Sequence, residues 1–340
     1  MNINILNHNL FSLGIILIIS ILVAFRDYSV GIDTANYAYI YTENSGFQGF
    51  EPGFRFLIEF FNLLTPSPIL FFGFICLIVS AFHYFTYKNI TYIDKNNLTF
   101  LILFFSLMFF SSWYINNITN GLRQGISLSI LLYALVKYFI KKKYIKFAIF
   151  YGFSILFHNS SIFLLPFLLI YHVLSFKNFI YLWIILGFNY ILGFNEIFFQ
   201  KILSIIGYEH IYLLIKEYGL PEQNYYGFNL SFFIYTISFP LLSLFIHYTS
   251  KNPEKVLPVQ MLKLYMMLCL PYFILGFANY SNRYALIAWA FIPFLQLIII
   301  KQLNLSKRSL FILSISLFCF GIMYFYLFRF NFINFFTLGI

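Results

Sequence analysis

Long apolar stretches alternate with short polar segments along nearly the whole chain. Most of the stretches run for roughly 15 to 20 residues, about the length of a helix that crosses the hydrocarbon core of a bilayer. Their Phe, Leu and Ile residues are continuous rather than alternating with polar residues, which favours helices over barrel strands. The expected spans are about residues 10–25, 68–87, 98–114, 121–140, 144–157, 161–175, 179–194, 230–248, 259–277, 284–300 and 309–328.

This pattern predicts an all-α integral membrane protein. We expect a single polytopic domain over residues 1–340, a bundle of about 10–12 transmembrane helices with short cytoplasmic loops. Two longer loops, residues 26–64 and 195–229, are expected on the extracytoplasmic side. In the second loop, apolar residues recur at helical spacing, which predicts an amphipathic helix along the membrane surface.

The first long loop contains a short helix of its own. Glu51 can cap this helix, with Pro52 at its first position. The segment carries Arg55 and Glu59 and is too short to span, so an interfacial or re-entrant helix is predicted.

Composition supports the membrane assignment. The chain is 61% hydrophobic and only 9% charged, whereas about a quarter of the residues in a soluble domain are charged. The net charge of +10 lies mostly in short loops between apolar stretches, which argues against nucleic acid as a partner. The sequence has no HExxH motif, Cys/His cluster or P-loop, and its first long loop has no DxD or ExD pair of acidic residues. Neither a metal nor a cofactor is therefore expected.

The distribution of charge predicts the orientation of the chain. With a cytoplasmic N-terminus, seven of the 21 Lys and Arg residues and nine of the eleven acidic residues lie outside. The other fourteen basic residues lie inside, as the positive-inside rule requires. These are Lys88, Lys95, Lys137, Lys141, Lys142, Lys143, Lys146, Lys177, Lys251, Lys255, Lys263, Lys301, Lys307 and Arg308.

The hairpin formed by residues 121–157 brings candidate chemistry to the outer surface. Arg123, followed by Gln124, lies near the start of a helix that Asn120 can cap, where a bound anion would satisfy both the helix amides and the guanidinium. The alternative is that Arg123 reaches lipid phosphate at the interface. His158 ends the hairpin at the same surface and is a candidate general acid or base, or a simple helix-capping residue.

Other external residues extend this set. Asp33 and Glu51 are candidate bases that could deprotonate a sugar hydroxyl, or else turn and cap residues. Arg283 follows a polar segment at the start of a helix, as Arg123 does, and two such arginines suit a pyrophosphate. Arg55 is a further candidate, with an ion pair to Glu59 as the alternative.

Several sequence segments together resemble a known family. GIDTANYAYIY with FEPGFRFL, then NGLRQGISLSILLYAL, a lysine-rich turn and ILFHNSSIFLLPFLL are similar to the EpsG-like polymerases. These are relatives of the Wzy polymerases of O-antigen and exopolysaccharide repeat units. The resemblance covers about residues 26–170, and the final third matches by its helix pattern and by Asn282-Arg283-Tyr284.

The resemblance implies a glycosyltransferase reaction in the bacterial inner membrane. A glycan on undecaprenyl pyrophosphate would be transferred to a new lipid-linked repeat unit at the outer leaflet, without metal or cofactor, with membrane lipid around it and a chain-length regulator as a further candidate partner. His158, Asp33 and Glu51 would then be catalytic candidates. The substrate-binding candidates would be Arg123, Gln124, Arg283, Tyr284, Arg55 and Tyr37.

Other membrane functions remain as alternatives. A different lipid-linked glycosyltransferase is disfavoured by the missing acidic pair, and an O-antigen ligase by the modest size of the external loops. A flippase or transporter would place charges at mid-membrane and would show repeated halves. A multi-helix acyltransferase would need a cytoplasmic acyl-CoA site, where only lysine-rich turns occur.

Overall fold

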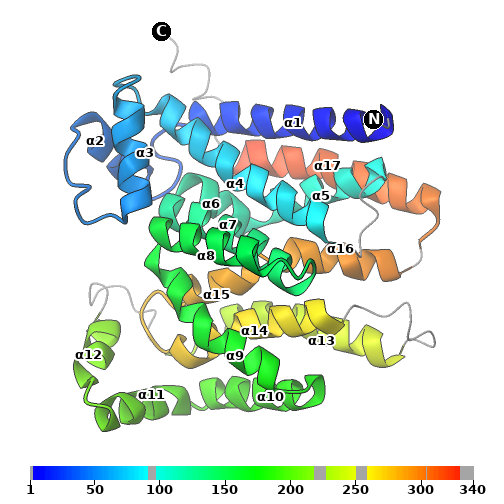
Figure 1. Cartoon of the computed structure of the whole chain (residues 1–340). Helices are drawn as coiled ribbons and strands as arrows, with labels where there is room; N and C mark the ends of the chain where they lie inside the picture. The colour runs from blue at the N-terminus through cyan, green and yellow to red at the C-terminus, as the bar shows by residue number, and fades with distance from the viewer. Residues whose placement is uncertain (1–2, 91–96, 218–226, 250–258, 304, 330–340) are drawn as a thin grey trace. The chain divides into compact units, whose positions relative to one another are not determined.

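The computed structural model describes residues 3–90, 97–217, 227–249, 259–303 and 305–329 (Figure 1). Every regular element in these ranges is a helix, which confirms the all-α prediction. The chain divides into two compact units, Met1–Ile162 with Leu303–Ile340, and Phe163–Gln302. The prediction of one domain over 1–340 stays a prediction.

Long apolar helices that pack side by side build the first unit. Helix α1 packs along α4, α4 along α7, α7 along α8, and α5 along α17 (Figure 1). Helix α5 is buried on nearly all sides, as its unbroken apolar sequence leads one to expect. The bounds are α1 Ile3–Ala24, α4 Ile69–Asn89, α5 Leu98–Phe110, α7 Leu122–Phe139, α8 Tyr144–Phe157 and α17 Lys307–Arg329.

The first long loop folds into two short helices, α2 (Thr34–Thr42) and α3 (Pro52–Asn62). Helix α3 begins at Pro52 as predicted, and it buries one face through Phe54, Leu57, Ile58 and Phe61. A Cβ atom added to Gly53 would lie 2.8 Å from the carbonyl oxygen of Leu156. Because glycine permits this close approach, the start of α3 lies directly against the end of α8.

A sharp break interrupts the stretch that was expected to be one span over 98–114. The chain bends by 70° at Ser111, between α5 and the short helix α6 (Ser112–Thr119). The hydroxyl of Ser111 accepts a hydrogen bond from the backbone N–H of Tyr114, so that it caps the new helix. Helix α6 then leads directly into α7.

Arg26, just after the end of α1, contacts three helices of the first unit: α1, α4 and α6. Its guanidinium is buried and donates to the carbonyl oxygens of Val23 and Thr119, which lie at the C-terminal ends of α1 and α6. Helix C-termini carry partial negative charge, and the face of Phe72 lies 4.1 Å from the guanidinium. Burial lowers the pKa of Arg26 to about 10, so it stays charged at neutral pH.

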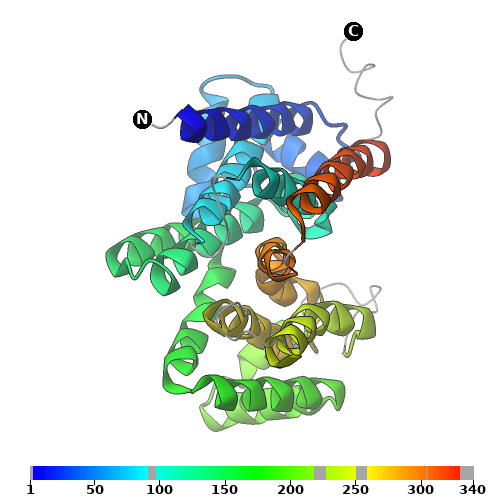
Figure 2. The same cartoon turned by 90° about the vertical axis from the view of Figure 1, so that its right-hand side faces the viewer.

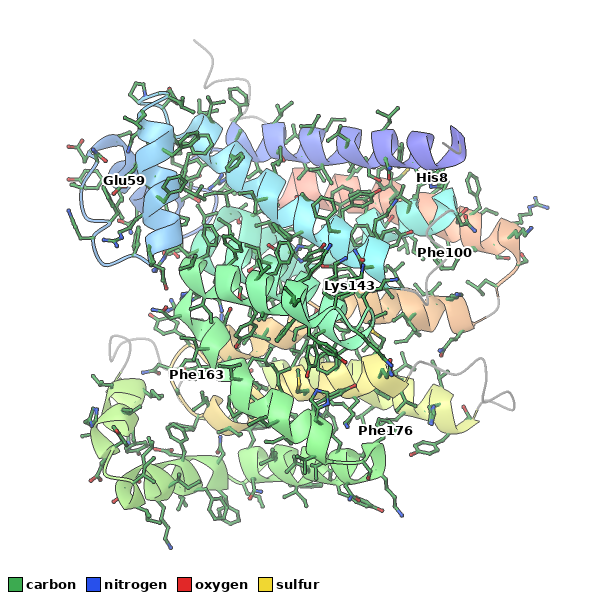
Figure 3. The ribbon with its side chains drawn as sticks, viewed as in Figure 1. His8, Glu59, Phe100, Lys143, Phe163 and Phe176 are labelled. Carbon is green, nitrogen blue, oxygen red and sulfur yellow. The ribbon has the colours of Figure 1, made fainter. Side chains whose placement is uncertain are left out.

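The lysine-rich end of the first unit lies away from the first long loop. Lys88 donates to Asn9 near the start of α1, and Lys137 donates to Asn89 at the end of α4. Figure 3 shows His8 and Lys143 away from Glu59 on α3. Lys143 and the start of α1 thus lie away from α3, and the predicted orientation of the chain across the membrane stays a prediction. Lys95, Lys251 and Lys255, which belong to the same prediction, lie outside the described residues.

Helix α14 forms the centre of the second unit and is buried over almost its whole length. Helices α10 and α11 meet at 99°, at Gly193, whose φ of +73° favours glycine. The bounds are α9 Leu165–Val173, α10 Phe176–Ile191, α11 Phe194–Ile205, α12 Glu209–Glu217, α13 Leu230–Thr249, α14 Val259–Leu275, α15 Asn282–Trp289 and α16 Ile292–Gln302. Figure 2 shows these elements from a second side.

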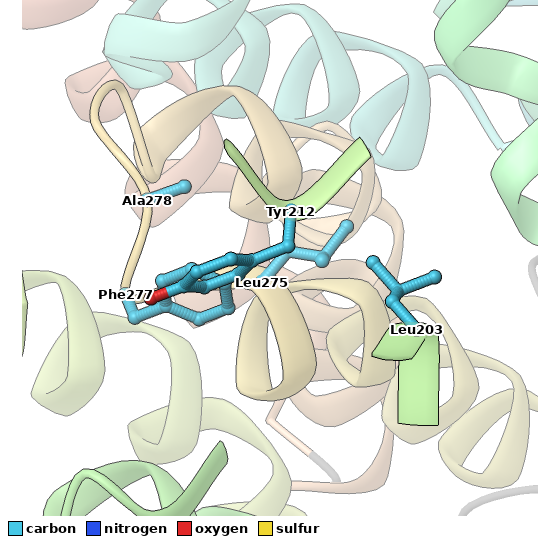
Figure 4. Close-up of a cluster of buried hydrophobic side chains, with 5 residues drawn as sticks. All are labelled: Leu203, Tyr212, Leu275, Phe277 and Ala278. Atoms are coloured by element: carbon cyan, nitrogen blue, oxygen red, sulfur yellow. The ribbon is translucent and has the colours of Figure 1, made fainter. Parts of the chain in front are cut away.

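The second long loop contains helical segments, but the single amphipathic helix that was predicted is divided into α11 and α12 by a turn at Gly207, whose φ is +78°. Its placement along a membrane surface stays a prediction. Leu203 of α11 and Tyr212 of α12 pack with Leu275, Phe277 and Ala278 (Figure 4). Helices α11 and α12 are thereby anchored to the end of α14. Residues 218–226 of this loop lie outside the described residues.

The described helices fit a protein that crosses a membrane several times. By length and composition, three helical stretches could span a bilayer. They are α4 (Ile69–Asn89), α13 (Leu230–Thr249) and α15 together with α16 (Asn282–Gln302). Two bent pairs, α5 with α6 and α10 with α11, would raise the number to five. The larger number of 10–12 also counts α7, α17 and the shorter apolar helices, and it stays a prediction.

Candidate functional site

Glu51 joins two residues that the sequence analysis singled out separately. Its Oε2 atom lies 2.8 Å from Nη1 of Arg123, and its Oε1 atom lies 2.7 Å from Nδ1 of His158. The side chain of Glu51 is 7% exposed, that of Arg123 28% and that of His158 25%. A buried carboxylate is thus held between a cation and an imidazole that are both partly exposed.

Three helix ends bring these residues together. Glu51 precedes α3, Arg123 is the second residue of α7, and His158 follows the last residue of α8. Gly125 allows α7 to pack tightly against α6, because a Cβ atom there would overlap the backbone oxygen of Asn117. The close contact of α3 with α8 at Gly53 brings Glu51 to His158.

The carboxylate of Glu51 is strongly favoured in its ionised form. Burial on its own would raise its pKa. The hydrogen bond from His158, the hydrogen bond from its own backbone N–H and the charge of Arg123 together lower that pKa to about 2. Since an ionised carboxylate only accepts hydrogen bonds, Nδ1 of His158 must be the donor to it. In the tautomer that carries its proton on Nδ1, Nε2 is the ring nitrogen that can accept another proton.

Aromatic side chains flank the guanidinium of Arg123. Its central carbon lies 4.4 Å from the centre of the Phe50 ring, a cation–π contact. Tyr37 is buried, interacts with Arg123 through its hydroxyl, and packs edge-on against Phe54. Nε of Arg123 has no hydrogen-bond partner among the described residues. These contacts fix the guanidinium in place while leaving part of its donor capacity unused.

Two capping roles expected from sequence are wrong. Gly121, not Asn120, is the N-cap residue of α7, and Oδ1 of Asn120 accepts the backbone N–H of Asp33 at 2.7 Å. Glu51 does occupy the N-cap position of α3, but its carboxylate makes no capping hydrogen bond. It turns to Arg123 and His158 instead, so the plain capping interpretation of Glu51 is excluded.

The remaining candidates of the first unit lie around this cluster. Asp33 precedes α2 by one residue, makes no side-chain capping bond, and lies close enough to Tyr37 to influence its pKa. Gln124 is buried next to Arg123. The backbone N–H of Arg55 donates to the backbone carbonyl of Glu51. The described residues contain no ion pair between Arg55 and Glu59, which was the predicted alternative.

Arg283 and Tyr284 belong to the second unit. They lie in the first turn of α15, with Ser281 at the N-cap position. The guanidinium of Arg283 lies 4.6 Å from the centre of the Tyr280 ring. A shared role of Arg283 and Arg123 on one pyrophosphate stays a prediction.

Three contributors to the cluster were not predicted from the sequence. Phe50 directly precedes Glu51 in the sequence, and this adjacency could have identified it as a neighbour of the site. The backbone N–H of Asn159 donates to Oε1 of Glu51 at 3.3 Å. Ser127, one helical turn after Arg123, contacts the segment that carries His158.

The described residues contain no group of three His, Cys, Asp or Glu side chains that could hold a metal ion. The independence from metal and cofactor stays a prediction.

A model of the EpsG family matches residues 9–338. The chain belongs to the EpsG family. The match includes the final third, which sequence resemblance had related only by its helix pattern and one short segment. No curated protein and no solved structure matches the chain. Family membership and the apolar helices together assign this EpsG-family protein to the membrane and to polysaccharide biosynthesis, in a polymerase-like role.

Proposed function

We propose that this protein is a polysaccharide repeat-unit polymerase. It would transfer a growing glycan from undecaprenyl pyrophosphate onto the non-reducing sugar of a new lipid-linked repeat unit. The observation that carries the proposal is the Glu51 carboxylate held between Arg123 and His158. A transfer of this kind needs a base for the acceptor hydroxyl and a cation for the leaving pyrophosphate, and the cluster contains both.

His158 is the base in this proposal. Glu51 holds Nδ1–H, which orients the ring and stabilises the imidazolium that forms, the arrangement seen in catalytic dyads and triads. Nε2 takes the proton of the acceptor hydroxyl while its oxygen bonds to the anomeric carbon of the donor sugar. The bond from that carbon to the pyrophosphate oxygen breaks, and the electron pair leaves with the pyrophosphate. Asp33 is the second candidate base.

Arg123 stabilises the leaving group. It lies in the first turn of α7, where the free backbone amides of a helix also attract an anion. Nη1 is engaged by Glu51, and the remaining donor capacity of the guanidinium would stabilise the developing charge. Arg55, Gln124 and Tyr37 are substrate-binding candidates beside it, and Arg283 with Tyr284 would supply a second cationic site.

The charge distribution supports an external active site. The cluster lies at the end of the first unit that carries α3, away from Lys143 and the start of α1 (Figure 3). Under the positive-inside rule the lysine-rich end is cytoplasmic. The N-terminus is then inside and the site faces the outer leaflet of the bacterial inner membrane, where lipid-linked repeat units are exposed.

The size profile of surface glycan in a strain that lacks the gene tests this function. Polymer should collapse to one repeat unit and return with the wild-type gene, but not with Arg123→Ala or His158→Ala at equal membrane abundance. A profile unchanged by the deletion would contradict the proposal. Complete loss of surface repeat units would indicate a flippase, and polymer retained on the lipid carrier would indicate a ligase.

A further inference from the structure

Ser127 connects the helix of Arg123 to the turn of His158. Its side chain is fully buried, one turn after Arg123 on the same face of α7. The hydroxyl oxygen lies 2.7 Å from the carbonyl oxygen of Ser154 and 2.7 Å from the hydroxyl of Ser161. It also lies 3.4 Å from the carbonyl oxygen of His158. One hydroxyl on α7 thus contacts both ends of the 154–161 segment.

The hydrogen bonds of this network can be assigned. The Ser127 hydroxyl has one proton, which it donates to the carbonyl of Ser154, and it accepts the proton of the Ser161 hydroxyl. The carbonyl of Ser161 accepts a hydrogen bond from the hydroxyl of Tyr151 at 2.6 Å. The backbone N–H of Ser161 donates to the carbonyl of His158. Ser161 is therefore held by two side chains, Ser127 of α7 and Tyr151 of α8.

His158 depends on this network for its position. Helix α8 has ended at Phe157, and the backbone of His158 is extended, with φ −163° and ψ 125°. Its N–H donates to the carbonyl of Ser154, the same oxygen that accepts the proton of Ser127. The side chain of His158 is held by Glu51. Within the described part of the chain, the hydrogen bonds that join its backbone turn to α7 are those of the Ser127 hydroxyl to the 154–161 segment.

We infer that Ser127 is a positioning residue for His158, an inference that rests on the proposed function. Ser127 does not touch substrate. It keeps the imidazole of His158 at a fixed distance from Glu51 and at a fixed place relative to Arg123. This is because the imidazole and the Arg123 guanidinium are then both positioned by α7. Since small displacements of a catalytic group cost rate, loss of the Ser127 hydroxyl should slow the chemical step more than it weakens substrate binding.

Ser129 provides a matched control. It lies on α7, is also fully buried, and its hydroxyl donates to the carbonyl of Ile126 within the same helix at 2.8 Å. Replacement of either serine by alanine removes one buried hydroxyl from the same helix. Only the Ser127 substitution removes the hydrogen bonds of a buried α7 hydroxyl to the His158 turn.

The test uses the full-length protein purified in detergent and lipid-linked repeat units extracted from the deletion strain. We expect Ser127→Ala to lower kcat about tenfold, the loss that corresponds to one net hydrogen bond, with KM nearly unchanged. Ser129→Ala should keep the wild-type kcat, and Ser127→Thr, which retains the hydroxyl, should recover most of it. His158→Ala is the reference for the proposed function.

The outcomes separate the inference from the function on which it rests. Wild-type activity in His158→Ala would contradict the assigned base and the inference together. An inactive His158→Ala with a Ser127→Ala variant as active as Ser129→Ala would overturn the inference alone. Equal losses of kcat and melting temperature in Ser127→Ala and Ser129→Ala would also overturn it, because they would show a packing role. If Ser127→Ala is not recovered folded, a Ser127→Thr variant with lowered kcat would overturn the inference, and one with normal kcat would support it.

Discussion

Nδ1 of His158 lies 2.7 Å from Oε1 of Glu51, although 107 residues separate them in the chain. The second oxygen of the same carboxylate binds Arg123. Glu51 therefore contacts an imidazole and a guanidinium at once, and loss of its charge would remove one hydrogen-bond acceptor from each.

The charge of Glu51 should be essential for polymerisation. Glu51→Gln keeps the size of the side chain but loses the charged acceptor, and hydrogen bonds to charged groups contribute about 1.5–3 kcal/mol. We expect roughly a 10- to 150-fold lower rate of chain extension, measured with extracted lipid-linked repeat units. Glu59→Gln, on the exposed face of α3, is the control and should leave the rate unchanged. Equal rates in both variants would refute the role of Glu51.

Lysine should not replace Arg123. Lys keeps the positive charge, but it cannot use one nitrogen for Glu51 and present further donors in a fixed plane against Phe50. Arg123→Lys should therefore raise KM for the lipid-linked donor by about tenfold or more, and Arg123→Ala should also lower kcat. Arg283→Lys, tested in parallel, shows whether the second predicted cation behaves in the same way. Normal kinetics in Arg123→Lys would mean that its charge alone matters.

Glu51 should make the stability of the protein depend on acid pH. Its pKa is lowered from 4.5 to about 2 in the folded state. Its contribution is fully present above about pH 4.5 and disappears as the pH falls towards 2. The difference corresponds to at most about 3 kcal/mol. Melting curves in detergent should show a larger loss between about pH 6 and pH 3 for wild type than for Glu51→Gln. Parallel curves for the two proteins would contradict this.

Gly125 should tolerate no larger residue. A Cβ atom there meets the backbone oxygen of Asn117, so Gly125→Ala must separate α6 from α7 and move Arg123. We expect a loss of about 1–3 kcal/mol in stability, with reduced polymerisation. Gly152→Ala on α8, which has nothing within 4 Å of the added atom, is the control. Wild-type melting and activity in Gly125→Ala would show that the helices can adjust without cost.

Sequence reasoning located the main helices because continuous apolar stretches set their length and polar residues mark their ends. It placed α8 at Tyr144–Phe157 and the start of α3 at Pro52. It missed α2, whose Thr, Asn and Tyr residues lack an apolar periodicity. The break at Ser111 was also missed, because apolar residues continue on both sides of it.

The candidate site was predictable only in part. Topology alone placed Arg123 and His158 at one surface, since both lie at the same end of a hairpin. The bridge through Glu51 depends on how α3 packs against α8, which a contact at Gly53 decides. The role of Ser127 was hidden for a similar reason: a serine inside an apolar helix has no distinctive pattern until its partner segment is known.

The most direct test of the central claim is the product formed by the purified protein from extracted lipid-linked repeat units. Wild type should lengthen the glycan and release one undecaprenyl pyrophosphate for each linkage made. Glu51→Gln, Arg123→Ala and His158→Ala should each lose most of this activity while they remain folded. Chain extension at the wild-type rate by all three variants would contradict the account, because it would place the chemistry outside the cluster around Glu51.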